Sequence, residues 1–115
     1  MSNWTHVAGI IRIDDFGRCL GRKPLDFIEL IGKEVSEDDW EDTESNPDKY
    51  LPFGSEGSLH MTVWENPSKS SLWGYTISIF GDLRDHDNPE EIVEWFKKIC
   101  AKFCVRDATI TVNNE

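Results

Sequence analysis

Residues 58–65, SLHMTVWE, and residues 72–81, LWGYTISIFG, carry the pattern that decides the fold. In the first stretch every second residue from Leu59 to Val63 is apolar and is predicted to face inward. In the second stretch the aromatic or β-branched residues Trp73, Tyr75, Ile77 and Ile79 are predicted to share one face. Alternation with a period of two is typical of strands that bury one face. Residues 66–70, NPSKS, have the composition of a hairpin loop, so the two stretches are predicted to pair as a β-hairpin.

Two further strands are predicted, one near each end of the chain. Residues 6–14, HVAGIIRID, are rich in β-branched residues and carry apolar side chains on both faces, which is typical of a central strand. Residues 107–112 alternate as well, with Ala108, Ile110 and Val112 facing inward. The sequence therefore predicts four strands.

Two helices are predicted, one before the hairpin and one after it. Residues 88–91, NPEE, form a helix start, because Asn88 can cap the helix and Pro89 lacks the N–H group that would stay unpaired there. An inward stripe follows at helical spacing and consists of Ile92, Phe96, Ile99 and Phe103. The earlier helix begins at Pro24 and ends near Gly32, and it is the shorter of the two.

The element order is strand, helix, strand, strand, helix, strand. Two right-handed β-α-β units joined by a hairpin give the ferredoxin-like βαββαβ arrangement, an α+β fold with two helices on one face of a four-stranded antiparallel sheet. A chain of 115 residues is enough for one domain, so residues 1–115 are predicted to form a single α+β domain.

The face of the sheet opposite the helices is predicted to be open. Strand alternation places there His6, Ala8, Ile10, Arg12, His60, Thr62, Trp64, Thr76, Ser78, Phe80, Thr109 and Thr111. Ferredoxin-like RNA-binding modules stack bases on this face, but the chain resembles them only in topology and has no RNP-type run of basic, glycine and aromatic residues. Such a mixed surface suits a protein contact or a homodimer better, or it is simply solvated.

Charge is concentrated in one segment. The chain has 12 basic and 22 acidic residues, and residues 34–48 contain eight of the acids and no Lys or Arg. We interpret residues 36–50 as a long acidic loop with one helical turn, in which Trp40 supplies an apolar anchor. The predicted partner-binding residues are Glu37, Asp38, Asp39, Trp40, Glu41, Asp42 and Glu44. This charge disfavours direct binding of nucleic acid and favours a protein partner with a basic surface.

The cysteines and the apolar runs indicate a cytoplasmic protein. Three cysteines, Cys19, Cys100 and Cys104, make an odd count, and no secretory signal is recognisable, which favours a reducing compartment. We interpret the cysteines as buried apolar thiols rather than zinc ligands. No apolar run is long enough to cross a membrane, so no membrane contact is predicted.

No metal, cofactor or catalytic residue is assigned from the sequence. Asp82, Asp85, His86, Asp87 and Asn88 provide oxygen and nitrogen donors, but they lack the spacing of a calcium-binding loop, and turn and capping roles explain them equally well. Phosphate-binding glycine motifs are absent from the sequence, and no nucleophile–base pair can be argued.

These observations favour a small acidic, non-catalytic interaction domain that binds a basic macromolecular surface. One form of this hypothesis is a mimic of nucleic-acid charge, or an inhibitor of the phage or mobile-element type. The alternative is a small-ligand or metal-dependent enzyme that uses the open sheet face, with His60, Trp64 and the Asp82–Asp87 cluster. A homodimer through the sheet face is a third hypothesis.

Overall fold

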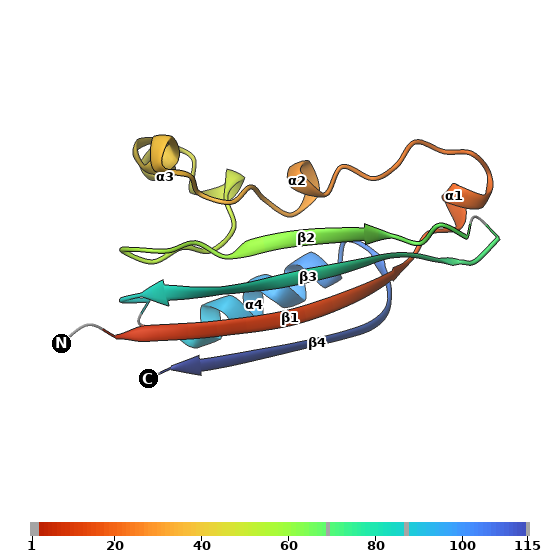
Figure 1. The fold of residues 1–115 in the computed structure, drawn as a ribbon. Helices are drawn as coiled ribbons and strands as arrows, with labels where there is room; N and C mark the ends of the chain where they lie inside the picture. Colours follow the sequence, from red (N-terminus) through yellow and green to blue (C-terminus); the bar gives the residue numbers. More distant parts are fainter. Residues whose placement is uncertain (1–2, 69, 87, 115) are drawn as a thin grey trace.

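Four strands form one antiparallel sheet in this computed structural model, which describes residues 3–68, 70–86 and 88–114 without the side chains of Arg18 and Cys19. The strands are β1 (Trp4–Asp14), β2 (His60–Glu65), β3 (Trp73–Arg84) and β4 (Cys104–Asn114). Their order across the sheet is β2-β3-β1-β4 (Figure 1). The predicted α+β class with a four-stranded antiparallel sheet is therefore confirmed.

The core lies between the sheet and α4 (Pro89–Cys100), which covers one face of it (Figure 1). The N-terminus of α4 forms as the sequence predicts, because the Asn88 side chain accepts a hydrogen bond from the Glu90 N–H and Pro89 occupies the first turn. Ile77 of β3 and Ile92 of α4 are at most 1% exposed, and Ile110 of β4 is partly buried against the same cluster. Burial of these side chains is the main stabilising contribution.

The connection between β1 and β2 differs from the prediction. Residues 15–59 contain only short helices: α1 (Phe16–Cys19), α2 (Phe27–Leu30), η1 (Glu37–Asp39), α3 (Trp40–Ser45) and η2 (Pro47–Lys49). The helix predicted from Pro24 to Gly32 is reduced to α2, because Gly32 adopts a φ of 142° and the chain then turns to pair Lys33 with Tyr50. The acidic segment is likewise not a loop with one turn but a run of three short helices.

One strand residue faces the side opposite to its prediction. The β1–β3 ladder shifts register after Ile13, so Tyr75 pairs with Ile13 but Trp73 pairs with Asp14. This irregularity bypasses Gly74 and places the Trp73 ring 5.7 Å from the ring of Trp64 on the open face. The prediction that Trp73 shares the inner face with Tyr75 is wrong, because a bulge interrupts the alternation.

Candidate functional site

The acidic segment is held in place by hydrogen bonds to two of its own carboxylates. The Asp39 carboxylate accepts hydrogen bonds from the Ser36 hydroxyl at 2.6 Å and from the Ser36 N–H at 3.2 Å. Lys33 Nζ lies 3.2 Å from the same carboxylate. The bonds from Ser36, with a smaller contribution from Lys33, lower the pKa of Asp39 below its usual value. Asp39 therefore fixes the start of the helical run from within.

A tyrosine fixes the other end of this segment. The Tyr50 hydroxyl donates to one oxygen of Asp42 at 2.6 Å, and the Asn46 side chain donates to the other at 2.8 Å. The hydrogen bond from Tyr50 and that from Asn46 lower the pKa of Asp42, while the bond to Asp42 raises the pKa of Tyr50 to about 12. Tyr50 is itself only 6% exposed, so α3 is attached to a buried residue.

Four carboxylates remain on the outside of this segment. Glu37, Asp38, Glu41 and Glu44 are exposed, and within the described residues none of them forms an ion pair. We call these four residues the acidic face. Residues 37, 41 and 44 follow one another at helical spacing, which places their side chains on one side of the continuous run from η1 to α3.

The remaining members of the predicted partner-binding set have internal contacts. Asp39 and Asp42 accept the hydrogen bonds described above. Trp40 is half-buried, and its ring packs edge-to-face against Phe53 at a centroid distance of 5.8 Å. Trp40 thus stabilises the segment against residues that follow it. No local sequence pattern links Trp40 to Phe53, which is why sequence reasoning missed this contact.

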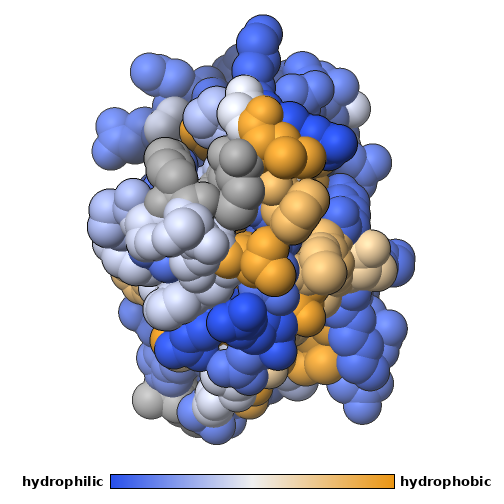
Figure 2. Space-filling view, turned by 90° about the vertical axis from the view of Figure 1, so that its right-hand side faces the viewer, coloured by the Kyte–Doolittle hydropathy of each residue, from blue (hydrophilic) through white to orange (hydrophobic). Residues whose placement is uncertain are grey.

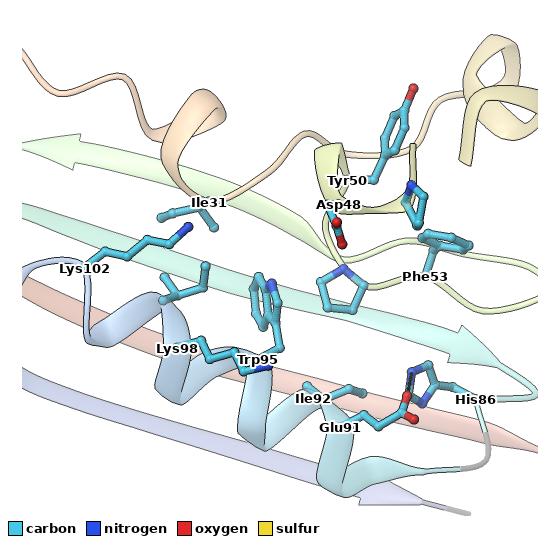
Figure 3. Close-up of a pocket in the computed structure, with 13 residues that line it drawn as sticks. Ile31, Asp48, Tyr50, Phe53, His86, Glu91, Ile92, Trp95, Lys98 and Lys102 are labelled. Carbon is cyan, nitrogen blue, oxygen red and sulfur yellow. Dashed lines mark ion pairs between the residues drawn. The ribbon is translucent and has the colours of Figure 1, made fainter. Parts of the chain in front are cut away.

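A groove lies between α4 and the end of the acidic segment (Figure 3). It has a volume of about 470 Å³, and its apolar wall includes Trp95 and Ile92 of α4 facing Phe53. Its full lining is Ile31, Pro47, Asp48, Tyr50, Pro52, Phe53, His86, Glu91, Ile92, Trp95, Lys98, Ile99 and Lys102. A neighbouring depression adds Glu90 and Glu94 to the carboxylates beside Trp95. We call this feature the α4 groove; the sequence reasoning did not find it.

Charges within the α4 groove are arranged along its length. Figure 3 shows Glu91 and His86 near the start of α4 and Lys98 and Lys102 toward its end. Lys102 Nζ donates to the Leu30 carbonyl at 2.7 Å and so attaches α2 to the end of α4. Acidic residues in the first turn and basic residues in the last follow the preference of the helix dipole.

The predicted Asp82–Asp87 cluster is divided among separate structural roles. Asp82 pairs with His6 at 2.5 Å, and the Asp85 carboxylate accepts hydrogen bonds from the Asn3 N–H and the Ser55 hydroxyl. The Asn3 bond, followed by that from Ser55, lowers the pKa of Asp85. Asp87 lies outside the described residues, and the part of the chain that is described holds no group of three or more side chains able to bind a metal.

His86 lines the α4 groove. Its side chain is 15% exposed, and Nε2 lies 3.9 Å from the Glu91 carboxylate. Nδ1 is buried and has no hydrogen-bond partner among the described residues. His86 therefore lies in a polar corner at one end of the α4 groove.

The open face brings five of the predicted residues together on two neighbouring strands, β2 and β3. His60 pairs with Phe80 in the β2–β3 ladder, and their rings lie 5.3 Å apart. Trp64 pairs with Thr76, and Thr62 lies between these pairs on the same face. Arg12 lies on β1, where its guanidinium is 2.8 Å from Asp107 of β4.

His60 also has a partner that sequence reasoning missed. Its Nδ1 lies 2.6 Å from the Glu34 carboxylate, which belongs to the acidic segment. A histidine oriented by a carboxylate resembles the pairing of a general base. His6 lies on the same face, but β3 runs between its strand and that of His60.

The cysteines do not all follow the prediction. Cys100 is half-buried at the end of α4, and burial raises the pKa of its thiol. Cys104 is exposed because it begins the edge strand β4, so the predicted buried thiol is wrong there. The side chain of Cys19 lies outside what the structure describes.

No protein-family model, no curated protein and no solved structure matches the chain. Among the described residues no helix is both long and apolar enough to span a membrane.

Proposed function

We propose that this chain is a non-catalytic interaction domain that binds a basic surface of another macromolecule through the acidic face. The observation that carries the proposal is the state of Glu37, Asp38, Glu41 and Glu44: they are exposed, they lack ion-pair partners within the described residues, and they are held on a fixed segment. A partner that supplies Lys or Arg would neutralise these charges, which the chain itself leaves uncompensated.

The arrangement around the acidic face supports the same proposal. Asp42 and Asp39 anchor the segment internally, so the backbone that carries the four outer carboxylates does not need to be ordered on binding. Asp48, Glu90 and Glu91 extend the negative charge to the rim of the α4 groove, where Trp95 offers apolar surface. An aromatic side chain beside a charged rim is a common construction of binding hot spots.

A basic nucleic-acid-binding protein is the partner class that this proposal favours. The net charge of -10 repels phosphate, and closely spaced carboxylates present the charge that such a protein meets on nucleic acid. A charge mimic would compete with nucleic acid for the same surface. We propose the cytoplasm as the place of action, since Cys100 and Cys104 are free thiols.

A ferredoxin-like topology is part of this proposal. It is supported by the antiparallel order β2-β3-β1-β4 and by a crossover helix, α4, between β3 and β4. The crossover between β1 and β2 has no helix longer than six residues, which makes the chain at most a variant of that arrangement.

The experiment compares two variants that lose the same charge. Glu41→Gln with Glu44→Gln removes half of the acidic face, and Glu29→Gln with Asp107→Asn removes two exposed carboxylates elsewhere. Binding to purified basic DNA-binding proteins is measured by titration calorimetry at several salt concentrations. We expect the acidic-face variant to lose about tenfold in affinity or more, and the control variant to lose about threefold or less.

The salt series makes the result decisive. Binding by the acidic face must weaken as salt rises, because the interaction of exposed charges is screened beyond about 10 Å at 0.1 M salt. The acidic-face variant should show a shallower dependence on salt than the control variant. Equal affinities and equal salt slopes for the two variants would reject the acidic face as the contact.

The Glu34–His60 pair favours a second candidate function, a small-ligand site on the open sheet face. The imidazole is held beside the ring of Phe80, which is 46% exposed and offers a flat apolar surface to a ligand. Thermal unfolding with divalent cations and nucleotides tests this candidate, because a ligand of the native state raises its stability. An unchanged midpoint at saturating ligand would exclude those ligands.

A further inference from the structure

The free edge of β2 is a surface that the proposed function does not use. β2 is an outermost strand, and β3 is its neighbour on the other side. The Asn66 N–H donates toward β3, to the Gly74 carbonyl at 2.8 Å, whereas the Leu59 N–H donates away from it, to the Pro52 carbonyl at 3.0 Å. Alternate residues of an antiparallel strand point their N–H and C=O groups to opposite sides.

That alternation turns the backbone groups of Met61 and Val63 away from β3. Both residues lie an even number of positions from Leu59, so their N–H and C=O groups share its outward direction. Within the described residues none of these groups has a hydrogen-bond partner. An unpaired row of this kind is a template for another strand.

A groove runs along this edge between β2 and residues 24–36. It comprises two cavities of about 460 and 550 Å³ that share Ile28 and Met61 in their linings. The larger is lined by Pro24, Leu25, Asp26, Phe27, Ile28, Met61, Val63, Glu65 and Tyr75. Ile28 is 61% exposed and Val63 is 41% exposed, so both walls of this groove offer apolar surface to a ligand.

The short first crossover explains why this surface is uncovered. A full-length helix over residues 24–32 would cover the inner side of β2, but α2 is only four residues long. β2 contains no Lys or Pro that would hinder pairing, and its one acidic residue, Glu65, lies at its end.

Further apolar side chains lie at the same end of the molecule. Figure 2 shows them as a continuous band across the end where α1 and the β2–β3 turn lie in Figure 1. The strongly exposed apolar residues of α1 and the adjoining loops are Phe16, Leu20 and Leu72, which are 63%, 65% and 45% exposed. Exposed apolar surface that is contiguous in this way marks interaction sites.

We propose that the β2 edge and its groove bind an extended peptide segment of another protein, which adds to the sheet as a further strand. Main-chain hydrogen bonds to Met61 and Val63 would set its register. Side chains on one side of the peptide would enter the groove against Ile28, and those on the other side would lie beside Trp64, which is 49% exposed on the open face. This is the strand-addition mode of peptide recognition.

The surroundings of the groove define the chemistry of the peptide. Apolar side chains at every second position match the walls. The two linings contain Asp26, Glu65 and Glu34, of which Glu34 already faces His60, against one lysine, so their net charge is negative and favours a peptide with basic ends. The one Lys in these linings, Lys33, is already paired with Asp39. Residues 24–36 flank the edge, so a single strand fits there, whereas a second copy would bring its own flanking segment to the same place.

The test uses a defined peptide and the full chain. The probe is acetyl-KVTVTVK-amide, and binding is followed by amide chemical shifts and amide hydrogen exchange. We expect the Met61 and Val63 amides to shift and to become protected from exchange when the probe is added. Val63→Pro removes one outward donor at a position that an edge strand tolerates, and it should weaken binding about tenfold or more.

Two controls separate strand addition from attraction of a basic peptide to an acidic chain. Probes that carry N-methyl groups on alternate residues have unchanged charge; methylation on the residues facing β2 should abolish binding, and methylation on the intervening residues should preserve it. Ile28→Asp, at an exposed position, should weaken binding about tenfold without loss of folding, which circular dichroism checks. Acidic-face variants should bind the probe as the unmodified chain does.

Three results would overturn the proposal. The first is the absence of shifts at Met61 and Val63 at millimolar probe. The second is equal binding of both N-methylated probes. The third is protection of these two amides without any probe together with a doubled mass in light scattering, which would assign the edge to a second copy of the chain.

Discussion

Two connections each join strands that are not neighbours in the sheet, and they are built in different ways. Residues 85–103 link β3 to β4 through α4, whose Ile92, Phe96 and Ile99 are almost fully buried. Residues 15–59 link β1 to β2 through helices of three to six residues. The connection from β1 to β2, which we call the first connection, is a series of turns held by individual contacts. The connection from β3 to β4, the second connection, packs on the sheet through one stripe of apolar side chains.

The difference separates the parts that stabilise the fold from the parts that offer binding surfaces. A continuous apolar stripe packs α4 against the sheet, so the helix and the sheet together form a scaffold. The first connection exposes the acidic face, forms one wall of the α4 groove and leaves the inner side of β2 open. Binding residues are commonly carried by irregular segments on a rigid scaffold, and this chain follows that division.

The largest predicted effect is the loss of the α4 stripe at its centre. Phe96 is 5% exposed and belongs to the core cluster, so Phe96→Ala is expected to lower the free energy of unfolding by about 3–5 kcal/mol. The matched change in the first connection is Trp40→Ala, expected to cost about 1–2 kcal/mol because Trp40 is only half-buried. Urea unfolding measures both losses. Equal losses would mean that the two connections contribute alike to stability.

A smaller effect is predicted where the first connection docks on β3. Gly57 has a φ of 82°, and a Cβ there would lie 2.2 Å from the Asp82 carbonyl oxygen. Gly57→Ala should therefore cost about 2–3 kcal/mol, from the left-handed backbone and the displacement of β3 together. Gly21→Ala is the control, because Gly21 has a φ of 78° but no atom within 4 Å of the added Cβ.

The difference in unfolding free energy between the two glycine variants measures the cost of the close contact between residue 57 and the Asp82 carbonyl oxygen. Gly21→Ala should cost only about 1 kcal/mol, the price of left-handed backbone alone. Thermal unfolding by calorimetry compares the two variants. If the two variants have the same unfolding midpoint, residues 53–58 are not closely packed on β3. The first connection would then be attached less firmly than its contacts indicate.

The contrast between the two connections also describes which parts of the fold can be predicted from the sequence. The four strands and α4 follow from local periodicity and from the cap at Asn88, because a buried face must repeat at the period of its own element. The side chain of Trp73 lies on the face opposite to the predicted one because a bulge changes the register. No residue of the strand indicates this bulge in the sequence. Local patterns thus predict elements but not their irregularities.

The first connection could not be predicted in this way because long-range contacts hold it. Tyr50 pairs with Lys33 across the acidic segment, and Glu34 reaches His60 on the sheet. These partners are separated by 17 and 26 residues, and no spacing rule relates them. The acidic charge itself was visible in the sequence, whereas its division into inner carboxylates, such as Asp42, and outer ones, such as Glu41, required the structure.

The smallest predicted effect is a pH dependence confined to the first connection. The pKa of Tyr50 is raised from 10.0 to about 12 chiefly by its hydrogen bond to Asp42, so this contribution to stability is present below pH 10 and is lost as the pH rises toward 12. The pKa of Asp42 is lowered by the same bond, so its contribution is present above pH 3.8 and is lost as the pH falls below that value.

Ultraviolet titration of the tyrosinate measures the alkaline limb. The difference between the unmodified chain and Tyr50→Phe should show a midpoint near pH 12, and Asp42→Asn should move the Tyr50 midpoint back toward 10. At acid pH, hydrogen exchange should show residues 37–50 opening before α4 does, because the hydrogen-bonded carboxylates of Asp39 and Asp42 hold the former, whereas buried apolar side chains hold α4. If α4 opened at the same pH, the Tyr50–Asp42 bond would belong to one cooperative unit with the core, and the two connections would differ in construction but not in independence.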